Sequence, residues 1–167
     1  MPLCGYPYDA VRLADYTDYT LRVLMYCATH TERLVTVAEL AEKHRLSRNH
    51  LMKIVTDLGR QGLLETTRGR GGGVRLLERP EHIRIGDVVR AAETDFRLVE
   101  CFDADTDQCT LSASCRLKGV FNAALQAYFR ELDAKTLADI IAPVPAAAPA
   151  ASPARTSASP SASASAR

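Results

Sequence analysis

Apolar side chains recur at intervals of three and four residues in successive short segments, which predicts amphipathic helices. The first pattern predicts a helix from Asp18 to about Thr29, with Thr17 as its N-cap. The apolar face of this helix consists of Leu21, Leu24, Met25 and Ala28. A second, short helix, VAELAEKH, follows Thr36, which we expect to form a capping box with Glu39. Two consecutive helices are therefore predicted near the start of the chain.

A third helix and a hairpin complete this part of the pattern. Ser47 is the expected N-cap of RNHLMKIVTDLGRQG, a helix that Gly59 or Gly62 ends. Its apolar face consists of Leu51, Ile54, Val55 and Leu58. The strand candidates LLETT and VRLL then flank the glycine-rich turn RGRGGG. This chain order predicts a mainly α fold with a small β-wing, a winged helix-turn-helix domain over residues 11–80.

Two further helical patterns follow the hairpin. IGDVVRAAE predicts a linking helix, and residues 81–115 combine it with a cysteine-containing loop. Residues 116–141 are expected to form a long C-terminal dimerisation helix, because helix-turn-helix proteins usually bind two half-sites as dimers. The apolar stripe of this segment consists of Leu117, Val120, Phe121, Ala124, Leu125, Tyr128 and Leu132. An intramolecular packing role for the same stripe is the alternative.

The two ends of the chain lack these patterns. Residues 142–167 contain eleven Ala, six Ser and five Pro, a composition that predicts a disordered tail. Residues 1–10 are expected to be a short N-terminal extension, or the result of a start codon assigned ahead of Val11. No apolar run suits a membrane span or a signal peptide, so we expect a cytoplasmic protein without membrane contact. In that compartment, clustered cysteines favour metal or redox chemistry over structural disulfides.

The net charge of +1 conceals a basic segment. Residues 43–75 carry eight Lys or Arg and two carboxylates, a local charge of +6. A basic stretch in an otherwise balanced chain indicates an interface for a polyanion. The winged helix-turn-helix order makes double-stranded DNA the expected partner, and a solvated basic face with a flexible loop is the alternative.

The predicted DNA contacts come from helix starts and from the hairpin. Arg48 can pair with guanine, whereas Asn49 or His50 can contact other base edges. Ser47 and Lys53 suit phosphates better. Glycine permits close backbone approach, so the hairpin arginines are expected to enter or flank a minor groove. The complete predicted set is Thr36, Ser47, Arg48, Asn49, His50, Lys53, Arg68, Arg70, Gly71 and Gly72.

Three of the five cysteines, Cys101, Cys109 and Cys115, lie close together in an acidic segment. The gaps of seven and five residues lack the close Cys-x2-to-4-Cys pair of a structural zinc site. Three thiolates on a loose loop suit an iron-sulfur cluster, with one position left for a ligand from elsewhere. Inert free thiols are the alternative, and Cys27 is expected in the core. The histidines and carboxylates form no catalytic pattern, so an enzyme is not expected.

Residues 11 to about 141 resemble the winged-helix iron-sulfur regulators of the IscR and NsrR type. The resemblance is carried by VRLADYTDYTLRVLMYCA, SRNHLMKIV, RGRGGG, IRIGDVVRAAE and the three-cysteine loop followed by RLK. It implies a homodimeric repressor with a [2Fe-2S] or [4Fe-4S] cluster held by Cys101, Cys109 and Cys115. It further implies that nitric oxide attacks the iron and releases the protein from promoters of nitric oxide detoxification genes.

The resemblance also implies a fourth ligand. In NsrR-type proteins an aspartate near the start of the partner's first helix can serve, and the matching position here is Asp18. Asp18 equally suits the first turn of a helix, where the helix dipole favours a carboxylate. The first cysteine gap is longer than expected for the family, and the acidic insert FDADTDQ has no explanation from the sequence. A same-fold regulator of cluster or redox status and a zinc-stabilised adaptor without DNA remain alternatives.

Overall fold

The computed structural model describes residues 12–103 and 105–142. Its elements are α1 (Asp15–Ala28), α2 (Val37–His44), α3 (Arg48–Arg60), β1 (Leu64–Thr67), β2 (Gly73–Leu76), η2 (Pro80–His82), α4 (Ile85–Ala92), η3 (Glu100–Phe102), η4 (Ser112–Ser114), α5 (Arg116–Asp133) and α6 (Leu137–Ile141). The predicted mainly α fold with a small β-wing is confirmed. The predicted extension 1–10 lies outside the described residues, as does the predicted tail 142–167 except for Ala142. No helix in the described part of the chain has the length and apolar character that a membrane span requires.

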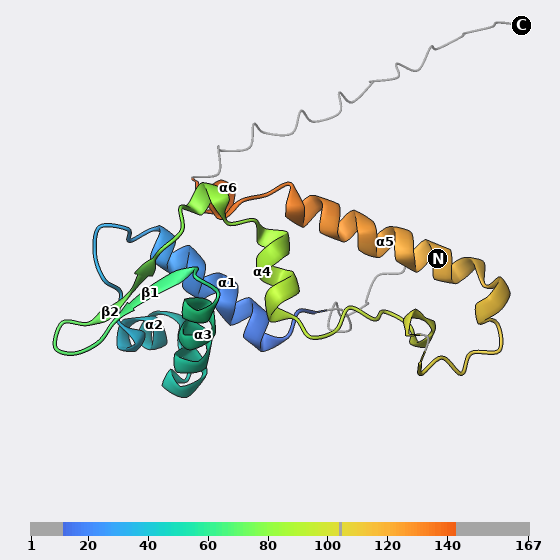
Figure 1. The fold of residues 1–167 in the computed structure, drawn as a ribbon, viewed down its shortest axis with the longest axis horizontal. Coiled ribbons are helices and arrows are strands. Elements are labelled where there is room, and N and C mark those ends of the chain that lie inside the picture. The colour runs from blue at the N-terminus through green and yellow to red at the C-terminus, as the bar shows by residue number, and fades with distance from the viewer. Residues whose placement is uncertain (1–11, 104, 143–167) are drawn as a thin grey trace, which may run out of the picture.

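The core forms where α1, α2, α3 and the hairpin meet (Figure 1). Most of the apolar residues that the sequence placed on the inner faces of these helices are buried there, but Leu21 is half-buried and the prediction was wrong for Met25, which is 37% exposed. Leu24 of α1, Leu40 of α2 and Leu51 and Ile54 of α3 are fully inaccessible to solvent. Burial of each such side chain contributes about 1.5–3 kcal/mol, and this holds the three helices in a fixed arrangement.

The predicted start of α1 was wrong by one turn. The helix begins at Asp15 with Ala14 as its N-cap, whose carbonyl accepts the backbone N–H of Asp18 at 3.1 Å. Thr17 is fully buried inside the first turn, and its hydroxyl donates to Glu93 Oε2 at 2.5 Å. The Thr17 hydroxyl therefore links α1 to the C-terminal end of α4 by a hydrogen bond and does not cap α1.

The helix-turn-helix contains α2, a tight turn and α3. The Thr36 hydroxyl accepts the backbone N–H of Glu39 at 3.1 Å, as the capping pattern predicted. The Glu39 carboxylate does not complete the capping box, because it is bound by Arg33 at 2.5 and 2.9 Å. Arg45, at φ 56°, ends α2 in the left-handed conformation. Ser47 occupies the N-cap position of α3 but makes no side-chain capping bond in the described structure.

The hairpin is a two-stranded antiparallel sheet with Leu64 opposite Leu76 and Thr67 opposite Gly73. It is attached to the segment before α2 by two backbone hydrogen bonds. Val35 N donates to Val74 O at 2.9 Å, and Val74 N donates to Val35 O at 2.8 Å. A Cβ on Gly73 would lie 2.7 Å from Val35 O, so only glycine permits this close approach. The wing is therefore fixed to the helix-turn-helix at its base.

The predicted single helix over residues 116–141 is two helices in the structure. α5 ends at Asp133, and Thr136 starts α6 with a capping box in which Asp139 is the partner. The fully buried Leu137 places α6 against the core. α5 itself has no buried residue and extends away from the other helices (Figure 1). Its C-terminal end lies against α4, so most of its length is free of the core.

Candidate nucleic-acid interface and cysteine loop

The predicted DNA-contact residues lie on the surface of the helix-turn-helix and the hairpin. The exposed members are Thr36, Ser47, Arg48, Asn49, His50, Lys53, Arg68, Arg70 and Gly71, and Gly72 is half-buried. Those on α3 occupy its first two turns, and those on the hairpin occupy its turn. Together they form an exposed surface, which we call the reading head.

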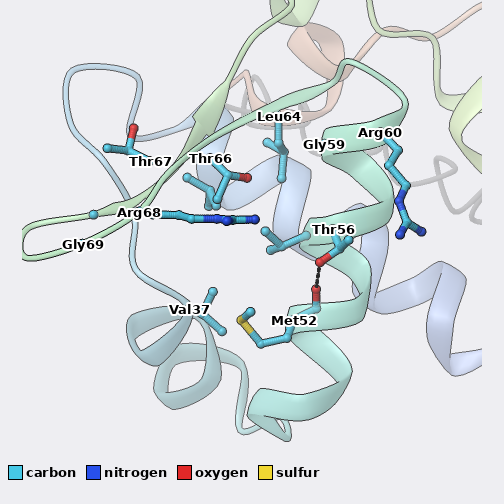
Figure 2. A pocket seen from close by; sticks show the side chains of 14 residues that line it. Val37, Met52, Thr56, Gly59, Arg60, Leu64, Thr66, Thr67, Arg68 and Gly69 are labelled. Atoms are coloured by element: carbon cyan, nitrogen blue, oxygen red, sulfur yellow. Dashed lines mark hydrogen bonds between the residues drawn. The ribbon is translucent and has the colours of Figure 1, made fainter.

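A cavity of about 620 Å³ separates α3 from the hairpin. Figure 2 shows the Arg68 side chain extending from the hairpin across this cavity toward α3. The α3 wall includes Met52, Thr56 and Arg60, which the sequence did not suggest as contacts. Their spacing of four residues places them on one helix face, and that periodicity was the available signal. Met52, which is 52% exposed, adds an apolar group to the cavity that Arg68 also lines.

The arginines in and around the reading head differ in whether a carboxylate already neutralises their charge. Arg60 pairs with Asp57 at 3.2 Å, and Arg75 pairs with Glu65 at 2.7 Å. In contrast, Arg48, Arg68 and Arg70 form no ion pair with any residue that the structure describes. Their full charge is available to a polyanion, and such unpaired cations supply the electrostatic part of DNA affinity.

Lys53 is held against α1 by an aromatic ring. Its Nζ lies 5.3 Å from the centroid of the Tyr16 ring, within the range of a cation–π interaction. The Tyr16 hydroxyl donates to Asp57 Oδ2 at 2.7 Å. Burial, together with this hydrogen bond and the charge of Asp57, raises the pKa of Tyr16 to about 12. Tyr16 therefore stays neutral, and its ring lies beside the Lys53 ammonium on the surface of α3.

The three cysteines of the loop have different environments. Cys101, on η3, is 8% exposed, Cys109 is exposed, and Cys115 is half-buried at the N-cap of α5. All three are free thiols. Within residues 12–103 and 105–142, no three His, Cys, Asp or Glu side chains are gathered as a group that could hold a metal ion. The structure thus places the thiols on one segment without bringing them together.

The donor chemistry of this segment nonetheless fits an iron-sulfur cluster. Free thiols become the thiolate ligands that such clusters use, and three of them lie in the segment between α4 and α5. Asp18, the predicted fourth ligand, is on α1 and pairs with Arg22 at 2.6 Å. It lies in the first turn of α1, where the helix dipole favours its charge.

The acidic insert between Cys101 and Cys109 has a structural role in the loop. The Arg97 guanidinium donates to Asp103 and also to Asp95, the latter at 2.9 and 3.0 Å. Asp103 in turn accepts the backbone N–H of Asp105 at 3.0 Å, and this bond together with the Arg97 contact lowers the pKa of Asp103. Similarly, Asp107 accepts the backbone N–H of Cys109 at 3.0 Å. Part of the insert therefore holds the loop in tight turns.

Known proteins similar to this chain are transcriptional regulators. Residues 13–143 match the Rrf2 family, described as an iron-dependent transcriptional regulator. The HTH-type transcriptional regulator NsrR of Bacillus licheniformis is 50% identical over 132 residues, which cover 78% of this chain and 92% of the relative. NsrR of Bacillus subtilis is 49% identical over 132 residues, with 78% and 90% covered.

Solved structures give the fold independently. IscR of T. potens has a TM-score of 0.64 and 24% identity, covering 81% of this chain and 89% of that one. The oxidised form of CymR from Staphylococcus aureus has a TM-score of 0.65 and 22% identity, covering 81% and 99%. The relatives are named as regulators, in agreement with the prediction that this chain is not an enzyme. The chain belongs to the Rrf2 family of DNA-binding transcriptional regulators, and its similarity to NsrR-type members is confirmed.

Proposed function

We propose that this chain is a homodimeric repressor that holds promoter DNA until nitric oxide reacts with an iron-sulfur cluster on the cysteine loop. The observation that carries the proposal is the set of three free thiols in the segment between α4 and α5, in a chain half identical to an NsrR regulator. DNA held in this way would belong to promoters of nitric oxide detoxification genes, as the NsrR resemblance implies.

The reading head supplies the DNA contacts in this proposal. The start of α3 enters the major groove, where Arg48 and Asn49 meet base edges. Arg68 and Arg70 of the hairpin follow the adjacent backbone or minor groove. The cavity wall beside Arg68 adds Met52, whose exposed thioether and methylene groups suit the methyl group of a thymine.

The second subunit is proposed to cover the apolar stripe of α5. Leu117, Val120 and Tyr128 are 56%, 62% and 38% exposed in the single chain. A contiguous apolar surface of this kind marks an interaction site. A second copy fits it, because a self-complementary helix face is the simplest interface for a two-fold dimer, and two reading heads match two half-sites.

Cys101, Cys109 and Cys115 would hold the cluster, with Asp18 of the partner subunit as the candidate fourth ligand. When bound, the cluster supplies iron that reacts with nitric oxide. Cys115 immediately precedes α5, whereas Cys101 follows the segment that leaves α4. A shared set of ligands therefore ties the start of α5 to the DNA-binding domain. Loss of these bonds frees the loop, and a shift of a few ångströms spoils the register of half-sites about 34 Å apart.

Anaerobic purification tests the proposal. We expect a coloured protein that contains iron and sulfide, binds promoter DNA, and loses both its visible absorbance and its DNA on addition of nitric oxide. Cys109→Ala should lose the visible absorbance of the cluster, and with it both tight promoter binding and the nitric oxide response, with little effect on folding, since Cys109 is exposed. Ser114→Ala, an exposed position of the same loop, is the matched control and should respond normally.

Other outcomes contradict the proposal in different ways. Colourless, zinc-containing protein would refute the cluster. A coloured protein that keeps its DNA in the presence of nitric oxide but releases it on oxidation or cluster removal would indicate the alternative, a regulator of redox or cluster status.

A further inference from the structure

We propose that Arg90 and Asp133 form a joint that sets the angle between α5 and the DNA-binding domain, and so determines the half-site spacing that the dimer accepts. The inference rests on the dimeric function proposed above. It assigns a positioning role to two residues that lie outside both the reading head and the cysteine loop.

The two side chains meet in a bidentate pair. Arg90 of α4 donates from Nη1 to Asp133 Oδ1 at 2.7 Å and from Nη2 to Asp133 Oδ2 at 2.7 Å. The same guanidinium lies 4.3 Å from the ring centroid of Phe129, one turn earlier on α5. Two parallel hydrogen bonds constrain the direction as well as the distance between groups. The guanidinium therefore contacts two successive turns of α5 and fixes its inclination.

The joint lies at the end of α5 that the rest of the fold anchors. Beyond Asp133, Ile85 N donates to Lys135 O at 3.0 Å, and Leu137 N donates to Ile83 O at 2.8 Å. These backbone bonds fix where α5 ends. These backbone bonds do not fix the direction of the α5 axis. Because α5 has no buried residue along its length, that direction depends on the side-chain contacts of the last two turns of α5.

Gly86 allows α4 and α5 to approach at the joint. It is buried on α4, one turn before Arg90, and a Cβ there would lie 1.9 Å from Asp133 Oδ1. The same Cβ would lie 3.1 Å from Arg90 Nη1. Even one methyl group at this position would therefore displace the carboxylate from the guanidinium.

A small rotation at the joint has a large effect at the DNA. The hairpin and α3, which carry the reading head, lie on the opposite side of α4 from α5 (Figure 1), and a small domain is roughly 30 Å across. A rotation of about 10° would then move the reading head by about 5 Å, more than the roughly 3.4 Å step of one base pair. Because the α5 stripe is the proposed dimer seam, the angle at this joint sets the separation of the two reading heads.

Selection of bound sequences from a random double-stranded DNA library measures the accepted spacing directly. Wild-type protein should select paired half-sites at one dominant spacing. Asp133→Asn removes the charge at constant size, and Gly86→Ala displaces Asp133 while both charges remain. Both variants should select spacings that are broader or shifted by at least one base pair, with preference for the wild-type spacing reduced about tenfold.

A control variant and a stability measurement separate positioning from general damage. Glu81→Gln breaks an exposed pair with Arg79 on η2 and should keep the wild-type spacing. Thermal unfolding should show that both joint variants remain folded at the temperature of the selection. If both variants select paired half-sites at the wild-type spacing, the positioning role of Arg90 and Asp133 is wrong but the proposed dimer is not. Single half-sites selected by the wild-type protein would overturn the dimeric function together with the joint.

Discussion

Replacement of Gly73 by alanine tests how the wing is held. The added Cβ would lie 2.7 Å from the carbonyl oxygen of Val35 and 3.1 Å from Leu34 Cβ. Ordinary carbon–oxygen contacts are about 3.3–3.6 Å, so the strand has to retreat by at least about 0.6 Å. The obstacle is backbone, which cannot rotate away as the end of a side chain can.

The cost follows from the bonds that this retreat breaks. The two Val35–Val74 hydrogen bonds, at 2.8 and 2.9 Å, would lengthen to about 3.5 Å, the limit of a useful bond. Both residues are almost fully buried, so their N–H and C=O groups would lack water as a substitute. At about 1–1.5 kcal/mol for each bond, Gly73→Ala should lower the free energy of unfolding by about 2–3 kcal/mol.

Urea denaturation followed by circular dichroism measures this difference, and Gly59→Ala is the matched control. Gly59 lies within α3, and a Cβ there would make only ordinary contacts, 3.7 Å from Leu64 O and from Thr66 Oγ1. Alanine is the better helix former, so this control should gain up to about 1 kcal/mol. Equal stability of the two variants would refute the argument that the Val35 contact requires glycine.

Three further predictions concern acid stability, DNA contact and assembly. Hydrogen bonding from Arg33, and to a smaller extent from Tyr26, lowers the pKa of Glu39 from 4.5 to about 2. The ionised carboxylate therefore stabilises the fold above pH 4.5, and this stabilisation is lost as the pH falls toward 2. Glu39→Gln should reduce the pH dependence of the free energy of unfolding in this range, and an unchanged pH dependence would contradict the prediction. Arg48→Ala should weaken DNA binding, measured by fluorescence anisotropy, by about 1–3 kcal/mol and should reduce the sequence preference at one base pair. Equal weakening for all DNA sequences would indicate that Arg48 contacts a phosphate instead of a base. Val120→Glu should raise the dimer dissociation constant measured by sedimentation about 100-fold, because it buries a charge in the proposed seam. Asn122→Glu, on another face of α5, should leave the dissociation constant unchanged. A monomeric wild-type protein would refute the seam.

Periodicity predicted the helices and the wing because burial obeys it. Leu51, Ile54 and Leu58 share one face of α3 and are all buried, as their spacing required. The start of α1 was not predictable in this way, since the Thr17 hydroxyl bonds to Glu93, a residue 76 positions later. The capping preference of a residue depends only on its neighbours in sequence, so it cannot predict a hydrogen bond to such a distant residue. The break before α6, in contrast, had a local signal in Thr136 and Asp139.

The exposure of the predicted DNA contacts could be anticipated from their charge, whereas their contact with DNA stays a prediction. Arg48 and Arg68 are exposed, as expected for DNA contacts, because a cation without a partner is costly to bury. Met52 was missed because an apolar residue in an amphipathic helix usually belongs to the core. The approach of Arg90 to Asp133 was also outside the reach of the sequence, because these residues are 43 positions apart. The arrangement of the three loop cysteines around a cluster stays a prediction.

If the exposed apolar stripe of α5 is the dimer seam proposed above, regulation would depend on the amount of protein in the cell. Because α5 buries no residue within one chain, the free energy that orders the proposed seam comes from a second copy and depends on mass action. Dilution would then release DNA without any signal, and abundance would set how much nitric oxide is needed for derepression. In the proposed mechanism, protein copy number would thus be a second input besides nitric oxide.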